Sequence, residues 1–414
     1  MKSRLRVLIV GINYAPEASG NAPYTTSLAE GLVRAGHDVH VITGYPHYPE
    51  WRLTAGYRGW SQSEETNGVR VTRLRHHIPR SPNTLSRLHM ELSFGVRAVL
   101  SQWHSPDVVL VISPALFSSA LTIMRVRASV RRPAVGIWVQ DIYSLGVVET
   151  RQGGAGLGGL MGWIEARVLG STDGIVAIHD RFRQYMIDTL GIPEHITKVI
   201  RNWTHLPHSP AFDRKQMRRK MGWQEHEVVV LHAGNMGKKQ GLENVVNAAR
   251  IAEETDSDVR FVLMGSGNQR RQLESLAQNL GHIEFLNALP GDQFQMALAA
   301  ADVLLVNELP GVKDMAVPSK LTSYFNSGRP VLAATDEESV TASEVAAAGG
   351  GVRVDAADPE ALVLKAEELG RNPGLANALG SQGLRFRMET LSEATAIAKY
   401  DGFIKTMASS RRRK

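Results

Sequence analysis

Short apolar runs alternate with stretches of helical spacing along almost the whole chain of 414 residues. A buried parallel strand needs only a short apolar run, and the crossover to the next strand usually needs a helix, so this alternation is typical of strand–helix–strand units. In the first half we expect a helix over residues 25–35 that ends at Gly36. The strands expected there are 4–10, 39–43, 69–74, 108–112, 134–139 and 174–178.

The alternation stops once and then begins again. Residues 202–214 contain two prolines and show no period, so we interpret them as a linker. The strands expected after it are 228–232, 259–264, 283–285, 303–306, 331–334 and 352–354. The helices expected there are 242–253, 268–280, 292–300 and several more from 359 to 409.

This pattern predicts an α/β protein with two Rossmann-like lobes facing a central cleft. We place the first lobe at residues 1–205, the second at 206–390, and a terminal helix with a basic tail at 391–414. In open parallel sheets, ligands bind outside the carboxyl ends of the strands, so residues that follow strands are the first candidates for a site.

Composition excludes several classes of protein. The chain has no cysteine, which rules out disulfide scaffolds, thiolate zinc sites and cysteine nucleophiles. No metal-binding or nucleic-acid-binding motif is visible, and we expect no metal, cofactor or nucleic acid. The apolar run 5–10 is too short for a signal peptide, and no run approaches ~18 apolar residues, so we expect a cytoplasmic protein without a transmembrane helix.

The net charge of +6 is unevenly distributed. Residues 1–206 hold 22 Lys and Arg against 15 Asp and Glu, whereas residues 207–414 hold 25 against 26. A basic first half favours an anionic partner, such as a membrane surface or a phosphorylated substrate. The alternative is a general drift of the composition toward arginine.

Two loops that follow strands carry residues suited to anions. In the loop 11–21, Gly20 and Asn21 precede a helix whose backbone N–H groups could approach a phosphate; the alternative is a simple helix entry. This loop lacks the dinucleotide fingerprint. The second loop, 234–241, combines glycines with a lysine pair and suits a diphosphate, the alternative being a solvated turn. Its candidate residues are Gly234, Asn235, Lys238 and Lys239.

Other candidates also stand at strand ends. Gly265 and Gly267 form a weaker glycine turn, and Lys320 opens a helix, where it favours phosphate or hydroxyl binding. Asp141 follows strand 134–139 and could orient a hydroxyl or act as a base, although it could equally cap the next segment. His179 follows strand 174–178 and is a candidate for the acceptor or phosphate loop, with a structural role as the alternative.

Aromatic and basic residues are interleaved between Tyr45 and Trp60, a composition that suits sugar stacking, nucleic acid or a membrane interface. An apolar stripe at helical spacing follows it and is flanked by arginines. The interpretation for this stripe alone is a helix facing the core. Its members are Leu85, Leu88, Leu92, Val96, Val99 and Trp103.

Several longer segments, taken together, resemble the GT-B glycosyltransferases, and specifically the retaining family 4. The segments are LAEGLVRAGHDVHVIT, LHAGNMGKKQGLENVVNAA, FVLMGSGNQRRQLE, IEFLNALPGDQFQMALAAADVLLV and VPSKLTSYFNSGRPVLA. The Y-A-P-E opening at 14–17 and the Y-P-x-Y-P segment at 45–49 are most similar to the colanic-acid and exopolysaccharide type.

The resemblance implies metal-independent transfer, with retention, from a UDP- or GDP-linked sugar held by the second lobe. Leu289 would face the donor base, and Asp141 would orient the acceptor during front-face attack. The implied acceptor is a glycan or a polyprenyl-diphosphate-linked sugar bound by the first lobe. Such an acceptor, together with the basic first half, predicts peripheral attachment to the anionic inner face of the cell membrane.

The sequence departs from the family pattern at the donor site. Many members carry two glutamates spaced E-x7-E, but Ser323 stands where the second is expected, and Glu308 lies further upstream. Asn235 replaces the arginine of the phosphate loop, so Lys238 or Lys239 would supply the charge, and Lys320 would compensate. Two alternatives therefore stay open: a nucleotide-sugar 2-epimerase of the same fold, and an inactive GT-B scaffold.

Overall fold

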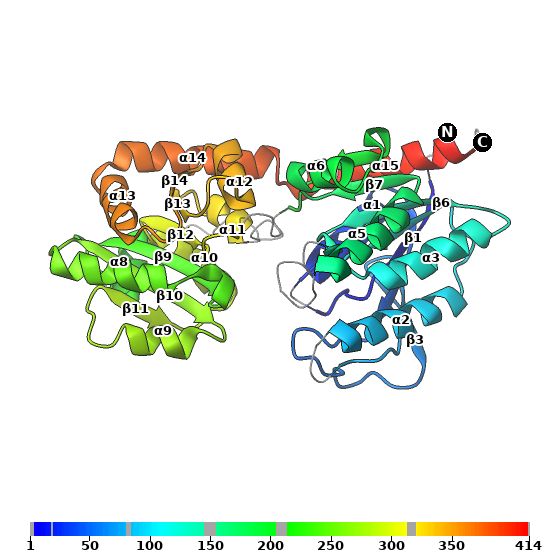
Figure 1. The fold of residues 1–414 in the computed structure, drawn as a ribbon, viewed down its shortest axis with the longest axis horizontal. Helices are drawn as coiled ribbons and strands as arrows, with labels where there is room; N and C mark the ends of the chain where they lie inside the picture. The colour runs from blue at the N-terminus through cyan, green and yellow to red at the C-terminus, as the bar shows by residue number, and fades with distance from the viewer. Residues whose placement is uncertain are drawn as a thin grey trace. The chain divides into compact units, whose positions relative to one another are not determined.

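A computed structural model describes residues 4–17, 20–79, 84–144, 155–203, 213–312 and 320–412. The chain divides into two compact units. Unit 1 comprises Met1–His205 and Glu393–Lys414, and unit 2 comprises Leu206–Ser392. Each unit is a sheet of mainly parallel strands with helices packed against it (Figure 1), which confirms the predicted α/β class with two Rossmann-like lobes.

Unit 1 is built on an eight-stranded sheet with the strand order β3-β4-β2-β1-β5-β6-β7-β8. The strands are β1 (Arg6–Val10), β2 (Asp38–Gly44), β3 (Ser61–Thr66), β4 (Val69–Leu74), β5 (Val108–Ile112), β6 (Ala134–Val139), β7 (Gly174–Ala177) and β8 (Thr197–Val199). The helices are α1 (Ala22–Arg34), α2 (Thr84–Leu100), α3 (Leu116–Ala128), α5 (Ala155–Gly170), α6 (Asp180–Asp188) and α15 (Glu393–Arg412), with a 3-10 turn at Glu194–Ile196.

Unit 2 is built on a six-stranded sheet with the strand order β11-β10-β9-β12-β13-β14. The strands are β9 (Val228–Asn235), β10 (Val259–Ser266), β11 (Ile283–Leu286), β12 (Val303–Asn307), β13 (Val331–Ala334) and β14 (Gly351–Val354). The helices are α7 (Arg214–Met221), α8 (Glu243–Glu254), α9 (Arg270–Leu276), α10 (Gly291–Ala300), α11 (Lys320–Asn326), α12 (Val340–Ala348), α13 (Pro359–Arg371) and α14 (Pro373–Glu389), with a 3-10 turn at Lys238–Gln240.

Both sheets reverse their direction of growth once. In unit 1 the chain builds outward from β1 through β2 to β4 and then returns to place β5 on the other side of β1. In unit 2 it builds from β9 through β10 to β11 and returns to place β12 beside β9. The place where the direction of growth reverses, between β1 and β5 or between β9 and β12, is called the switch point. The loops that follow the two strands there turn away from each other, and open α/β sheets bind ligands between such loops.

One part of the predicted sheet is wrong. β3 runs antiparallel to β4 at the edge of the unit 1 sheet, whereas we expected parallel strands only. Its sequence, SQSEET, is polar and mostly exposed, so it carries no apolar signal. The short strand β8 was also not predicted, because its three residues are too few to show a period.

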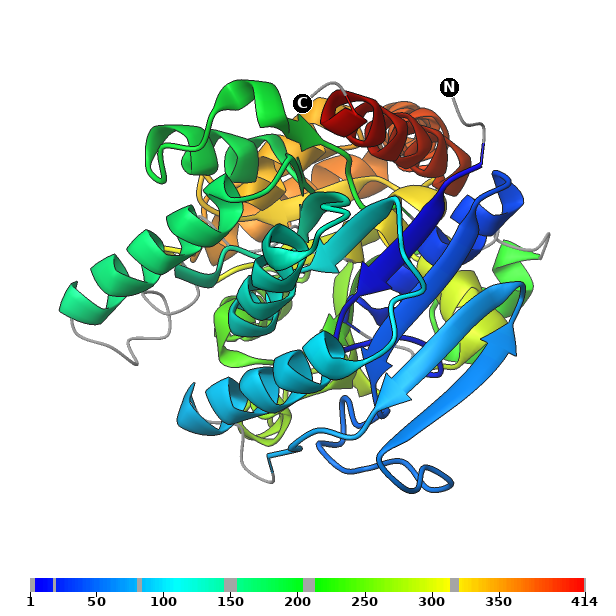
Figure 2. The same ribbon diagram turned by 90° about the vertical axis from the view of Figure 1, so that its right-hand side faces the viewer.

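The terminal helix packs in unit 1, although the sequence analysis set it apart with the tail. α15, red in Figures 1 and 2, contacts α1, β5 and β6. His37 accepts a hydrogen bond from the Leu5 N–H at Nδ1, so its Nε2 carries the proton that it donates to Asp401 at 2.7 Å. Lys405 donates to the other oxygen of Asp401, also at 2.7 Å. The returning helix is therefore fixed by polar contacts as well as by apolar packing.

The folded units extend into both ends of the predicted linker 202–214. Trp203 is fully buried in unit 1 and stacks on Trp138 with ring centroids 5.8 Å apart. Tyr400 of α15 packs against both rings. Residues 204–212 lie outside the described residues, and Arg214 already belongs to α7 of unit 2.

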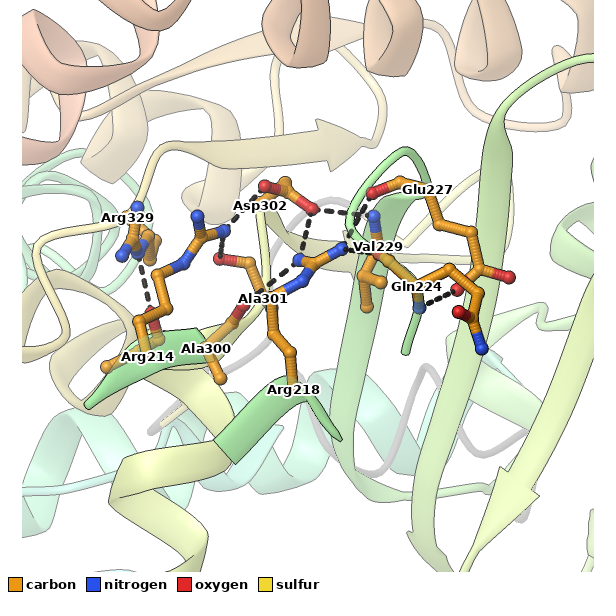
Figure 3. A network of polar contacts seen from close by, with 10 residues as sticks. Arg214, Arg218, Gln224, Glu227, Val229, Ala300, Ala301, Asp302 and Arg329 are labelled. Atoms are coloured by element: carbon orange, nitrogen blue, oxygen red, sulfur yellow. Dashed lines mark hydrogen bonds and ion pairs between the residues drawn. The ribbon is translucent and has the colours of Figure 1, made fainter. Parts of the chain in front are cut away.

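A charged network joins α7, the residue before β12 and the start of β9 in unit 2 (Figure 3). Arg214 and Arg218, both on α7, donate to the two carboxylate oxygens of Asp302 at 2.5 and 2.7 Å. The same carboxylate accepts the N–H of Val229 at the start of β9, at 2.9 Å. Arg218 is buried, so the pairing with Asp302 is what allows its charge to be taken from water. The network ties α7 to the first strand of the sheet.

Glycines in the unit 1 sheet provide room for α15. A Cβ atom added to Gly174 would lie 2.8 Å from the ring of Phe403 and 2.9 Å from the sulfur of Met407. We predict that Gly174→Ala lowers the free energy of unfolding by about 1–3 kcal/mol through overpacking. Urea unfolding followed by circular dichroism measures this.

Gly402, in the interior of α15, is the matched control. A Cβ atom there would meet nothing within 4 Å. Gly402→Ala should therefore stabilise the helix by about 0.5–1 kcal/mol. Equal unfolding midpoints for the two variants would contradict the assigned packing.

Candidate functional site

The switch point of unit 2 brings together the lysine of α11 and the end of β9. The Nζ atom of Lys320 lies 3.4 Å from Nε2 of His232, a fully buried side chain of β9. A Cβ atom on Gly234, which has a φ of +134°, would lie 3.8 Å from the same Nζ. Glycine at this position therefore leaves the β9 backbone open beside the ammonium group.

The charges at this point are poorly solvated. Burial lowers the pKa of Lys320 to about 8, although the nearby Glu308 carboxylate opposes this change. Burial and the Lys320 ammonium hold the pKa of His232 well below its usual range, so that the imidazole is neutral. Burial also raises the pKa of Glu308, against the effects of a hydrogen bond and of Lys320.

One carboxylate oxygen of Glu308 accepts no hydrogen bond from the described residues. Its Oε1 atom accepts a hydrogen bond from Thr341 at 2.5 Å, whereas its Oε2 atom is buried and has no hydrogen-bond partner among the described residues. A buried oxygen left in this state costs free energy unless a donor reaches it. Sequence reasoning found Glu308 only through an imperfect family spacing and did not predict this arrangement.

The glycine–lysine turn is fastened to the end of β12. Asn307 donates from Nδ2 to the carbonyls of Gln240 and Gly241 at 2.8 and 3.0 Å. The N–H of Leu309 donates to the Lys239 carbonyl at 2.9 Å. The turn that carries the exposed Lys238 and the half-buried Lys239 is thereby bonded to Asn307 and Leu309, the two sequence neighbours of Glu308.

The weaker glycine turn has a packing explanation. A Cβ atom on Gly265 would lie 1.9 Å from the carbonyl oxygen of Gly234, its parallel neighbour. One on Gly267 would lie 2.3 Å from the Met236 carbonyl oxygen. These glycines let the ends of β9 and β10 approach closely.

The remaining candidates of unit 2 are spread along the same edge. Ser323 is half-buried on α11, three residues after Lys320 and so on the same side of that helix. Asn235 ends β9 and is exposed. Leu289 follows β11, the edge strand two positions from β9, and packs against the core.

The switch point of unit 1 gathers polar groups at the ends of β5 and β6. Asn21 reaches the Ser113 carbonyl from its Nδ2 atom at 3.5 Å. The Ser113 hydroxyl donates to the backbone carbonyl of Asp141 at 3.1 Å. The Asp141 carboxylate accepts the N–H of Ile142 at 2.9 Å. Asp141 therefore lies at the predicted edge of the sheet, with its carboxylate bonded to the backbone of the next residue.

His179 and Gly20 have local structural contacts. The Nδ1 atom of His179 accepts the N–H of Arg181 at 3.1 Å, so this histidine caps α6. Gly20 has a φ of +65°, and a Cβ atom there would lie 3.5 Å from the ring of Tyr48. This contact places the first loop beside the segment 45–49.

A glutamate that sequence reasoning did not single out joins these two segments. The buried Glu17, last residue of the Y-A-P-E opening, accepts the N–H groups of His47 and Tyr48 at 2.8 and 2.9 Å. Its other oxygen accepts from Asn13 at 2.8 Å. The Glu17 carboxylate therefore joins the Y-A-P-E opening to the Y-P-x-Y-P segment. In the sequence, only the presence of both motifs pointed to this residue.

Two more buried carboxylates accept backbone N–H groups from the segments that follow β5 and β6. Glu91 of α2 accepts the N–H of Phe117 at 2.9 Å, and burial raises its pKa to about 7. Glu165 of α5 accepts the N–H groups of Tyr143 and Ser144, and burial raises its pKa also. The sequence gives no local signal for either, because each is a single acidic residue within a helix.

The predicted apolar stripe does not face the core as a whole, which corrects part of the expectation: Leu85, Leu92 and Val96 are exposed, Leu88 and Val99 are half-buried, and only Trp103, beyond the end of α2, is buried. Leu85 and Leu100 are 77% and 80% exposed. The buried face of α2 is instead formed by Met90, Phe94 and Ala98. The exposed stripe of α2, as named below, consists of Leu85, Leu92, Val96 and Leu100.

The aromatic segment 45–60 continues this surface. Trp60 is 71% exposed, and the Arg97 guanidinium lies over its ring, 4.3 Å from the centroid. Arg87 lies over Trp51 at 5.5 Å. Tyr45, by contrast, is buried and donates to the Arg58 carbonyl at 2.6 Å, so it supports the segment from below.

Among the described residues, no group of three or more His, Asp or Glu side chains is placed to hold a metal ion. No helix in the described part of the chain is long and apolar enough to cross a membrane.

Comparison with known families identifies the chain. Residues 19–203 match the glycosyl transferase 4-like domain. Residues 213–386 match the glycosyl transferases group 1 family. The chain is a GT-B glycosyltransferase. The two matches correspond to the two units, and they agree with the resemblance to family 4.

Individual relatives of this glycosyltransferase agree. It is 29% identical over 339 residues to the putative colanic acid biosynthesis glycosyl transferase WcaI of Escherichia coli (strain K12), covering 78% of this chain and 82% of that protein. Its fold is similar to that of sucrose-phosphate synthase from Thermosynechococcus elongatus, with a TM-score of 0.76, 18% identity, and coverage of 98% and 100%. Anabaena HepE in complex with UDP gives a TM-score of 0.71 at 13% identity, covering 97% and 100%.

The lowered pKa of Lys320 generates a pH prediction for the glycosyltransferase. Only the protonated amine attracts an anion, so the affinity for a nucleoside diphosphate should be constant below about pH 8 and fall above it, by at most about tenfold per pH unit. Calorimetric titration with UDP and GDP between about pH 7 and about pH 9 measures this. Lys320→Arg, which stays charged, should remove the fall; a wild-type affinity that does not change over this range would contradict the assignment.

Proposed function

We propose that the chain transfers a sugar, with retention, from a nucleotide-diphosphate sugar to a glycan or lipid-linked oligosaccharide in the synthesis of a cell-surface polysaccharide. The observation that carries this proposal is the switch point of unit 2. There, a poorly solvated ammonium group, an open glycine backbone and a carboxylate with an unused oxygen lie together. These groups complement the diphosphate and a hydroxyl of such a donor.

The lysines would stabilise the leaving group. In the transfer step the bond between the anomeric carbon and the diphosphate oxygen breaks, and the acceptor oxygen forms a bond to the same carbon on the same face. The diphosphate gains negative charge as it leaves, and Lys239 and Lys320 supply positive charge there; such electrostatic stabilisation is usually the largest catalytic effect. Binding of UDP by HepE supports a nucleotide donor.

Glu308 would hold a donor hydroxyl. Its buried Oε2 atom needs a hydrogen-bond donor, and a sugar or ribose hydroxyl can supply one. This role compensates for the serine at position 323, which is where the family pattern has a second glutamate. Leu289 would contribute an apolar wall for the base.

The acceptor would bind unit 1 at the ends of β5 and β6. Asp141 follows β6 at this edge, where its backbone carbonyl accepts the Ser113 hydroxyl, and its side chain would orient the acceptor hydroxyl or take up its proton. Asn21 and Gly20 would border the same region, where the first loop precedes α1.

The test measures sugar transfer and donor breakdown with a panel of UDP- and GDP-sugars, with and without acceptor. We expect Lys239→Ala and Lys320→Ala to lower kcat/KM by about 30- to 150-fold, equivalent to about 2–3 kcal/mol. Asp141→Asn should lose about 100-fold of transfer while still binding the donor. Lys215→Ala, which removes an exposed lysine of α7, is the control.

The other outcomes are distinct. Isomerisation of the donor without acceptor would indicate the 2-epimerase alternative, and neither reaction with any donor would indicate a scaffold. Wild-type kcat/KM in both lysine variants would remove the assignment of the donor site. Transfer with inversion of the anomeric centre, determined by NMR of the product, would contradict retention.

We propose further that unit 1 docks on the anionic inner face of the membrane. The exposed stripe of α2 and the exposed Trp60 offer apolar groups, and Arg87 and Arg97 lie beside them. Apolar side chains flanked by arginine suit an interface between headgroups and acyl chains. Each well-placed arginine would contribute about 1 kcal/mol at low salt.

Vesicle co-sedimentation tests the docking. The wild-type protein should bind vesicles that contain phosphatidylglycerol, and high salt should release it. Leu85→Ser combined with Leu100→Ser should weaken binding by about tenfold or more, because two exposed apolar groups are lost. The control pair is Leu276→Ser with Leu364→Ser, two leucines of unit 2 that are 45% and 67% exposed. Protein that stays in solution with anionic vesicles at low salt would refute docking.

A further inference from the structure

An arginine-lined depression lies at the amino-terminal edge of the unit 1 sheet. Its volume is about 800 Å³. The start of β1, the residues before β5 and β6, and the end of α15 contribute its walls. Parallel strands all begin at this edge, so the depression lies at the opposite end of the sheet from Asp141 and Asn21. The lining residues are Arg6, Pro106, Asp107, Arg131, Arg132, Pro133, Ala134, Ala408 and Arg411.

The lining carries an excess of positive charge, since it holds four arginines and one aspartate. Asp107 is engaged by Arg6, which approaches it from Nε at 3.3 Å and from its backbone N–H at 2.9 Å. Arg411 lies 3.5 Å from Asp173, a carboxylate that also takes the Arg127 guanidinium at 3.1 Å. The existing carboxylates are therefore already in use.

Arg131 and Arg132 provide the charge that remains. Both are exposed, and among the described residues neither has a carboxylate within ion-pair distance. Arg131 also lines a neighbouring depression of about 370 Å³, together with Pro106 and Pro133, so these three residues border both depressions.

The backbone that presents these arginines is fixed. Arg132 has a φ of +40°, a region that non-glycine residues adopt rarely and at a cost. Its N–H donates to the Ser129 carbonyl at 3.2 Å, and its own carbonyl accepts from Arg411 Nε at 3.4 Å. Pro133 follows directly, and its ring restricts the backbone of Arg132 before it. The turn from Ser129 and the side chain of Arg411 on α15 thus fix the backbone that places Arg131 and Arg132 in the lining of the depression.

We propose that this depression binds a phosphate-bearing anion with at least two negative charges. A guanidinium offers paired N–H donors that match phosphate oxygens, and several of them around one hollow favour a doubly charged group over a single carboxylate. The phosphate belongs either to a small soluble compound or to a lipid headgroup. This site is separate from the donor site of unit 2 and does not depend on the proposed transfer reaction.

Calorimetric titration of the full chain with inorganic pyrophosphate at low salt tests the site. The donor site of unit 2 also attracts pyrophosphate, so Lys239→Ala protein is the background for every measurement. In that background, Arg131→Ser with Arg132→Ser should weaken binding about tenfold or more. Arg219→Ser with Arg271→Ser removes the same charge from exposed positions of unit 2 and should leave the affinity unchanged. An equal affinity in both double variants would overturn the proposal.

Vesicles that contain phosphatidic acid distinguish the two sources. If a lipid headgroup is the ligand, the Arg131→Ser and Arg132→Ser pair should lower vesicle binding, and pyrophosphate should compete with the vesicles. If a soluble compound is the ligand, only pyrophosphate binding should fall. Circular dichroism confirms folding, and Arg131→Lys with Arg132→Lys provides a milder variant. If this lysine pair binds pyrophosphate as tightly as the two arginines do, charge alone explains the binding, and the proposed guanidinium recognition is wrong.

Discussion

The rest of the structure depends on one constraint. In each unit, the first strand forms a parallel pair with a strand that comes much later in the sequence. β1 pairs with β5, and β9 pairs with β12. The loops that follow the two paired strands run in opposite directions over the sheet. Polar groups between these loops therefore stay uncovered by the connecting helices. In unit 2 this edge holds Lys320 beside His232, and in unit 1 it holds Asp141 beside Ser113.

The charges at the switch point of unit 2 have a physical cost that a ligand would offset. Burial disfavours the charged form of Lys320 and of Glu308, and the neutral His232 does not compensate either of them. An incoming diphosphate would favour the ammonium form, and a hydroxyl would satisfy the free oxygen of Glu308. The arrangement is therefore poor for stability alone and well suited to binding a polar, anionic substrate.

Unit 1 is completed by a segment from the far end of the chain. α15 brings Phe403 and Met407 against Gly136 and Gly174, and it contributes Arg411 to the depression at the amino-terminal edge of the sheet. α15 also packs Tyr400 against Trp138 of β6 and against Trp203, which precedes the connection to unit 2. One helix thus closes the core, anchors the end of the first unit and lines the second candidate site.

The sequence by itself determined most of the sheets, because each buried parallel strand is a local apolar run; β4, β5, β6 and β13 lie where predicted. It also located the glycine–lysine turn and Lys320. Only the tertiary structure decided which apolar face of α2 is buried, since Met90, Phe94 and Ala98 have the same helical spacing as the exposed stripe. It likewise revealed the packing role of Gly265 and the free oxygen of Glu308, because both depend on neighbours distant in sequence.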